Sequence, residues 1–155
     1  KDLPLVPPKM VYLMAALYKI TKPTKHQIKL TVDGQTIEYS CILTAVMNGK
    51  HYGGGFTPTP MAVVNDGYLD ILRVDYVGPV QIMGLLGKYF KGTHVDLPIA
   101  HFLKGKDIKI ENNIEAVYSL DGEIVSEKIM HIRLMVGGLR LRLPKAVIEE
   151  YHAAK

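Results

Sequence analysis

The stretch that decides the fold spans residues 27–47 and reads QIKLTVDGQTIEYSCILTAVM. Its first part alternates polar and apolar side chains, as a strand with one buried face does, and the apolar positions are Ile28, Leu30 and Val32. Asp33-Gly34 then separates this run from a second, longer one. Because an Asp-Gly pair between two such runs is the strongest short-range hairpin signal, the segment predicts two antiparallel strands joined by a tight turn.

Working outward, the same reasoning predicts further strands at Tyr68–Val77, Asp107–Glu111, Ala116–Leu120, Lys128–Val136 and Leu139–Leu143. Helices are predicted at Lys9–Ile20, Pro79–Phe90 and Lys145–Ala154, and a loop rich in glycine and proline at Asn48–Asp66. The strands lie too close together in the sequence for helical crossovers. We therefore expect a mainly β protein, an antiparallel β-sandwich with two or three helices, and a single domain over residues 1–155.

Composition narrows the class of protein. Hydrophobic residues make up 48% and charged residues 22% of the chain, which is typical of a globular domain. No window reaches the ~18 consecutive apolar residues that a membrane-spanning helix needs. The single cysteine, Cys41, cannot form an intramolecular disulfide, so a cytoplasmic location is expected. The net charge of +4 comes without a dense Lys/Arg cluster, which gives little support to nucleic-acid binding.

Two of the three Asp-Gly pairs are candidate functional sites. Asp66-Gly67 ends the Gly- and Pro-rich loop, where a carboxylate beside free carbonyls can form an oxygen-only site for Mg²⁺. Asp121-Gly122-Glu123 places two carboxylates at the tip of two strands, where one could accept a proton from a substrate hydroxyl. Taken alone, each pair is better explained as a tight turn, as Asp33-Gly34 is.

The order of several motifs extends this interpretation. The chain reads VMNGKHYGGGFTP at residues 46–58, NDGYLD at 65–70, GTH at 92–94 and VYSLDGE at 117–123. This series resembles the bacterial diacylglycerol-kinase-like family of lipid kinases over nearly the whole chain. The resemblance implies two domains: an N-terminal α/β domain that binds ATP through a Gly-Gly-Asp-Gly signature, and a C-terminal β-sandwich of the NAD kinase/diacylglycerol kinase-like fold.

The resemblance also implies roles for individual residues. Asp121 would be the base that activates the lipid hydroxyl. A structural Mg²⁺ would be held by the carboxylate of Asp66 and by the backbone carbonyls of Val63 and Tyr68.

One departure from the family pattern changes what this chain could do. Gly-Gly-Asp-Gly occurs nowhere in the 155 residues. We therefore expect a C-terminal domain without its ATP-binding domain, excised because it begins at Lys1, and inactive by itself. The expected partners are ATP, a lipid hydroxyl substrate of phospholipid metabolism, the inner face of the membrane, and a second copy of the chain if an apolar interface is left exposed. Which lipid accepts the phosphoryl group stays open.

A non-catalytic β-sandwich that binds a ligand or a protein is the alternative. It would need neither Asp121 nor a metal ion. A Gly-Gly-Asp-Gly stretch encoded roughly a hundred residues upstream of Lys1 would favour the kinase, and a stop codon would favour the binding module.

Overall fold

The computed structural model describes residues 25–140, 142–145 and 147–149, and its six strands form one antiparallel sheet in the order β4-β3-β2-β1-β5-β6. The elements are β1 (His26–Val32), β2 (Gln35–Met47), the 3₁₀ turn η1 (Gly53–Gly55), β3 (Leu69–Asp75), α2 (Pro79–Lys91), β4 (Ala100–Gly105), β5 (Asp107–Leu120) and β6 (Glu123–Arg133). The predicted class is confirmed: the protein is mainly β and its sheet is antiparallel.

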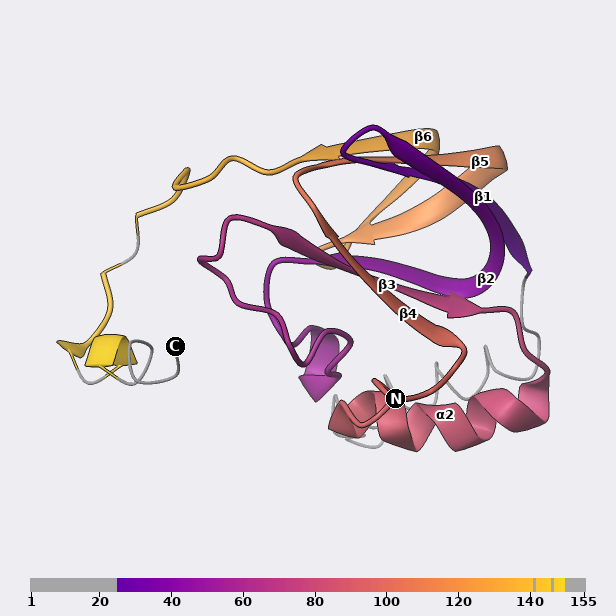
Figure 1. Cartoon of the computed structure of the whole chain (residues 1–155), viewed down its shortest axis with the longest axis horizontal. Helices are drawn as coiled ribbons and strands as arrows, with labels where there is room; N and C mark the ends of the chain where they lie inside the picture. The colour runs from indigo at the N-terminus through magenta and orange to yellow at the C-terminus, as the bar shows by residue number, and fades with distance from the viewer. Residues whose placement is uncertain (1–24, 141, 146, 150–155) are drawn as a thin grey trace, which may run out of the picture.

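The sheet folds over on itself, so that β1, β5 and β6 lie above β3 and β4 (Figure 1). The long strand β2 curves from the upper layer into the lower one, and its register with β3 shifts between Cys41 and Leu43, as expected where a bulge bends a strand. The core between the layers comes from β1, β5 and β3 together with the buried Cys41: Ile28, Leu30, Ile108, Ile110, Leu69 and Ile71. The result is the sandwich that the sequence predicts.

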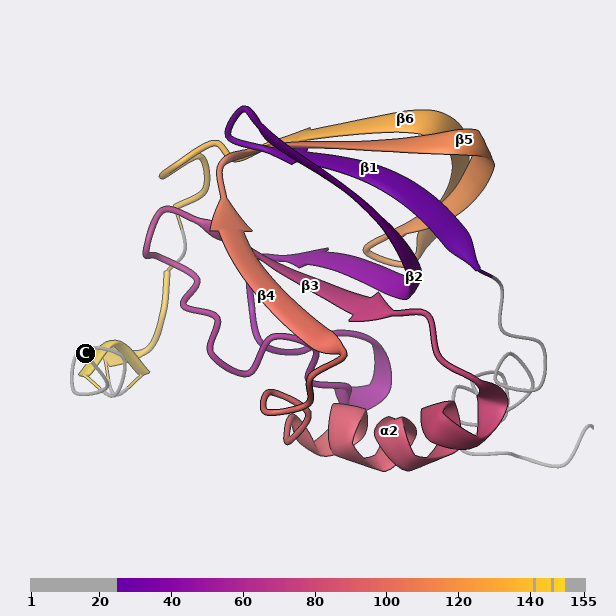
Figure 2. The same ribbon diagram turned by 45° about the vertical axis from the view of Figure 1, so that its right-hand side comes forward.

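Helix α2 covers the outer face of β3 and β4 (Figure 2). It begins at Gly78-Pro79, where the Gln81 side chain accepts a hydrogen bond from the Gly78 N–H, and it ends at Gly92 in the left-handed conformation. Its buried side chains recur on one face, and two of them, Leu85 and Tyr89, pack with Leu72, Val74 and Ala100 of the sheet. The predicted helix Pro79–Phe90 is confirmed to within one residue.

Two-residue turns close both hairpins of the upper layer. Asp33-Gly34 joins β1 to β2 with φ of 47° and 86°, and Asp121-Gly122 joins β5 to β6 with φ of 49° and 101°. Two successive positive φ angles are typical of the type I′ turn, which matches the twist of antiparallel strands. The predicted hairpin over residues 27–47 is therefore confirmed.

Four details of the strand prediction are wrong. The segments predicted as separate strands, Asp107–Glu111 and Ala116–Leu120, belong to the single strand β5, whose register with β6 shifts between them. The sequence predicts no strand over the residues of β4, Ala100–Gly105. Strand β6 begins at Glu123, five residues before the predicted strand Lys128–Val136. Residues 139, 140, 142 and 143, predicted as a strand, have no strand conformation, and in both views the chain beyond β6 leads away from the sheet.

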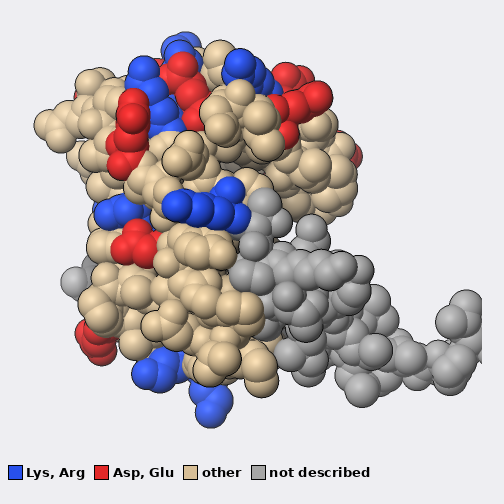
Figure 3. All heavy atoms as spheres, turned by 90° about the vertical axis from the view of Figure 1, so that its right-hand side faces the viewer, with Lys and Arg blue, Asp and Glu red and all other residues tan. Residues whose placement is uncertain are grey.

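The predicted helix Lys9–Ile20 lies outside the described residues. Of the predicted helix Lys145–Ala154, the described residues 145 and 147–149 are helical. Within the described part of the chain, no helix is both long and apolar enough to cross a membrane. On the face shown in Figure 3, basic and acidic side chains of the described residues are interspersed over the upper part of the molecule.

Candidate functional site

The loop between β2 and β3, residues 48–68, is fixed to the rest of the protein by hydrogen bonds along its length. The buried Thr59 donates its hydroxyl to the Gly49 carbonyl across the loop, at 3.0 Å. The Thr57 hydroxyl donates to the Phe90 carbonyl at 3.2 Å, and the buried His94 donates from Nε2 to the Pro58 carbonyl at 2.9 Å. The loop is therefore held on the C-terminal end of α2.

Aromatic rings complete this attachment. Phe56, which follows the three glycines, lies 5.4 Å from the Phe90 ring and 5.8 Å from the Tyr89 ring. The Tyr52 and Tyr89 hydroxyls are 3.2 Å apart. The loop is thus attached through Phe56 and the buried residues Thr57 to Thr59, whereas His51, Tyr52, Gly53 and Gly55 of the glycine-rich motif are exposed.

At its far end, the loop forms a turn that contains all three predicted metal ligands. The Asp66 N–H donates to the Val63 carbonyl at 3.2 Å, and the Tyr68 N–H donates to Asp66 Oδ1 at 3.0 Å. Gly67, with φ of 80°, allows the chain to reverse between these two bonds. The structure therefore brings Val63, Asp66 and Tyr68 into one short turn immediately before β3.

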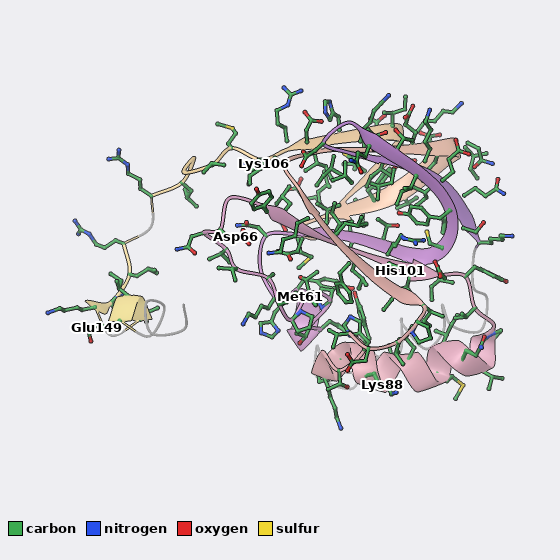
Figure 4. The ribbon with its side chains drawn as sticks, in the orientation of Figure 1. Met61, Asp66, Lys88, His101, Lys106 and Glu149 are labelled. Atoms are coloured by element: carbon green, nitrogen blue, oxygen red, sulfur yellow. The ribbon has the colours of Figure 1, made fainter. Side chains whose placement is uncertain are left out.

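A lysine that the sequence did not single out lies beside this turn. Lys104 of β4 is the register partner of Asp70 on β3, and its Nζ lies 2.6 Å from Asp66 Oδ2 and 3.4 Å from Asp70 Oδ1. The hydrogen bond from Lys104 lowers the pKa of the Asp66 carboxyl. Burial raises the pKa of the Asp70 carboxyl, whose Oδ2 has no hydrogen-bond partner among the described residues. Figure 4 shows Asp66 and the neighbouring Lys106 at this edge of the sheet, where β3 begins and β4 ends.

The turn fits Mg²⁺ in its donor chemistry. A carboxylate and two backbone carbonyls are the oxygen ligands that a hard cation takes, and Mg²⁺ keeps several waters when the protein supplies few ligands. Among the described residues there is no group of three His, Cys, Asp or Glu side chains that could hold a metal ion. The Lys104 ammonium, however, occupies one oxygen of the carboxylate that a cation would need.

Asp121, the predicted base, lies elsewhere in the molecule. It is exposed at the tip of the β5–β6 hairpin, and no other described side chain forms a hydrogen bond or an ion pair with its carboxylate. The outer part of this hairpin curves back toward the sandwich, where Tyr118 packs on the core and accepts a hydrogen bond from Asn112. The turn geometry alone would explain the Asp-Gly pair, so the role of Asp121 in catalysis stays a prediction.

Sequence comparison places the chain among known proteins. Residues 1–142 match the family model described as the YegS C-terminal NAD kinase beta sandwich-like domain. A diacylglycerol kinase of Mycobacterium tuberculosis (strain H37Rv) is 27% identical over 138 residues, which cover 88% of this chain and 44% of that protein. A protein of Salmonella gallinarum named probable lipid kinase YegS is 28% identical over 133 residues, covering 86% of this chain and 43% of that protein.

Solved structures give a similar result. A candidate diacylglycerol kinase from Bacillus anthracis str. Sterne superposes with a TM-score of 0.64 at 30% identity, covering 78% of this chain and 41% of that one. A second structure, of a diacylglycerol kinase from the same organism, gives 0.55 at 27% identity, covering 77% and 44%. The chain thus spans less than half the length of the relatives that it matches. Because the family model matches nearly the whole sequence, the chain belongs to the family of the YegS C-terminal NAD kinase beta sandwich-like domain.

Proposed function

We propose that the protein forms the C-terminal part of an ATP-dependent lipid kinase, which transfers the γ-phosphoryl group of ATP to the hydroxyl of a diacylglycerol-like lipid. The observation that carries this proposal is the family match over residues 1–142, because relatives of similar sequence are named diacylglycerol kinase and lipid kinase. The chain spans about 44% of the first of these relatives. ATP would bind mainly to a domain outside this sequence, and these 155 residues would be inactive without it.

In this reaction Asp121 acts as the general base. Its carboxylate accepts the proton of the lipid hydroxyl as the hydroxyl oxygen forms a bond to the γ-phosphorus, and the bond from that phosphorus to the β–γ bridging oxygen breaks to release ADP. The Asp121 carboxylate is exposed and has no hydrogen-bond or ion-pair partner among the described residues, so it is accessible to that proton. Little covalent chemistry falls to the protein, so the rest of the chain contributes by placing this carboxylate.

Asp66, with the carbonyls of Val63 and Tyr68, would hold a structural Mg²⁺. When bound, the ion would supply a fixed positive charge that orders the turn before β3. The ordered turn would follow a loop that is held together by the bond from Thr59 to Gly49 and attached to α2 by the bond from Thr57 to Phe90. Contact with a membrane surface at the cytoplasmic face and pairing with a second copy remain part of the proposal.

The test compares two aspartates that occupy equivalent turns. In the full-length enzyme, Asp121→Asn should lower kcat by about 10²–10⁴, the usual contribution of a general base. Asp33→Asn changes the same position of the other Asp-Gly turn and should leave kcat within a few-fold. Transfer of labelled phosphate from ATP to a panel of lipid alcohols gives the measurement, and circular dichroism verifies that both variants are folded.

If Asp121→Asn keeps wild-type turnover while the enzyme remains active, Asp121 is not the base. If the full-length protein phosphorylates none of the lipids, the kinase assignment fails and a binding module becomes the better account.

A further inference from the structure

Lys104 lies between two carboxylates that differ sharply in their surroundings. Its Nζ is closer to Asp66, at 2.6 Å, than to Asp70, at 3.4 Å. The Asp66 side chain is 25% exposed and the Asp70 side chain only 4%. The Lys104 ammonium therefore forms a short ion pair with the accessible carboxylate of Asp66 and a longer one with the buried carboxylate of Asp70.

The buried carboxylate is incompletely satisfied. Asp70 Oδ2 is inaccessible to solvent and has no hydrogen-bond partner among the described residues. Leaving a buried polar atom unpaired is costly, and more so when the group carries charge. Lys104 Nζ already lies 3.4 Å from the other oxygen of this carboxylate, Oδ1, so Asp70 offers the ammonium a second partner close to its present position.

A divalent cation and the lysine ammonium would compete for the same oxygen. The cation in the turn would need the Asp66 carboxylate, and Lys104 donates to Oδ2 of that carboxylate. Both oxygens of the Asp66 carboxylate are already used in this turn, Oδ1 by the Tyr68 N–H and Oδ2 by Lys104, so a cation that binds Oδ2 must take the place of the ammonium. A lysine suits an exchange of position, because its ammonium is a compact charge with three donors on a flexible stem.

We propose that Lys104 is an internal counter-ion of the turn, which a divalent cation displaces from Asp66 onto Asp70. This inference rests on the metal site of the proposed function. In the metal-free protein, Lys104 neutralises Asp66 and keeps the turn closed. In the metal-bound protein, Lys104 neutralises Asp70 and so ties β4 to β3 directly beside the occupied turn. Lys104 is thus a positioning residue, and its presence weakens the affinity of the turn for the cation.

Calorimetric titration of the full-length protein with MgCl₂ tests the exchange. Lys104→Met keeps most of the aliphatic stem and removes the competitor, so the Kd for Mg²⁺ should fall about three- to fivefold, the range set by a partly exposed ion pair. Lys88→Met removes the same charge from the last turn of α2, where no carboxylate of the described residues pairs with Lys88, and should leave the Kd within twofold. Asp66→Asn should abolish binding.

A crystal structure with and without Mg²⁺ gives a second readout that is independent of affinity. Lys104 Nζ should lie within hydrogen-bond distance of Asp66 in the metal-free protein, and of Asp70 alone in the metal-bound protein. Binding that requires Asp66 but has the same Kd in Lys104→Met would overturn the exchange and leave the metal site intact. The same holds if Lys104 still contacts Asp66 beside the bound ion. If the unsubstituted protein binds no Mg²⁺, both the exchange and the metal site fail, while the role of Asp121 is judged separately by turnover.

Discussion

Gly92, at the C-terminal end of α2, lies in close contact with the loop between β2 and β3. It ends the helix with φ of 72°, in the left-handed region. A Cβ atom at this position would lie 3.0 Å from Thr57 Cγ2, 3.2 Å from Thr57 Cβ and 3.3 Å from Pro60 Cβ. Gly92→Ala should therefore both strain the backbone and push the loop away from the helix.

The two effects have separate magnitudes. A left-handed conformation costs a residue with a Cβ about 1–2 kcal/mol. Forcing one methyl group into a closely packed contact costs about 1–3 kcal/mol more. We expect Gly92→Ala to lower the free energy of unfolding by about 2–5 kcal/mol.

Two other glycines separate strain from crowding. Gly34 has φ of 86° in the β1–β2 turn, and an added Cβ would meet nothing within 4 Å, so Gly34→Ala should show the strain alone, about 1–2 kcal/mol. Gly87 is exposed within α2 and an added Cβ is equally free there, so Gly87→Ala should stabilise the protein by up to about 1 kcal/mol. Urea unfolding followed by circular dichroism, with the m-value checked for constancy, measures all three. If Gly92→Ala cost no more than Gly34→Ala, the contact with Thr57 would not restrain the loop.

Two further predictions concern the core and pH. Ile71 is fully buried between the layers, so Ile71→Ala should destabilise the protein by about 2–5 kcal/mol in the same urea assay. The side chain of Ile114 is 68% exposed, so Ile114→Ala should cost under about 1 kcal/mol. Equal losses of stability in the two variants would contradict the assigned core. Burial raises the pKa of the Tyr39 phenol to about 12. Because this folded value lies above the unfolded value of about 10, the stability from Tyr39 is complete below pH ~10 and is lost as the pH rises toward 12. Burial also raises the pKa of the Tyr89 and Tyr118 phenols, so ultraviolet titration should show several late tyrosines, of which Tyr39→Phe removes one that titrates near pH 12. An unchanged titration curve in that variant would refute the assignment.

The parts of the fold that depend on local chemistry could be predicted from the sequence. Asp33-Gly34 encodes its own turn, and Pro79 and Gly92 mark the two ends of α2. Strand β4 was missed because its residues, Ala100 to Gly105, alternate poorly and gain strand conformation by pairing with β3. The segment Leu139–Leu143 has the alternating pattern of a strand, but its described residues have no strand conformation. Alternation indicates a face that could be buried, but it does not supply a partner strand.

In the candidate site, too, the residues that are close in sequence could be predicted and the distant one could not. Val63, Asp66 and Tyr68 lie within six consecutive residues, so a local turn is enough to bring them together, and sequence motifs could indicate them. Lys104 is 38 residues away from Asp66 and reaches it only through the register of β3 with β4. The spacing of residues in the sequence does not reveal that register, so the contact of Lys104 with Asp66 can be identified only from the folded structure.

The position of β1 in the middle of the sheet affects how the protein is made. Ile28 pairs with Tyr39 on one side and with Asn112 on the other. As the chain leaves the ribosome, the first partner arrives at once, while the second is synthesised about eighty residues later. Until then the β1–β2 hairpin has one open edge, so nascent chains must be shielded from one another during that interval, and assembly of the complete sheet is limited by the arrival of its most distant strand.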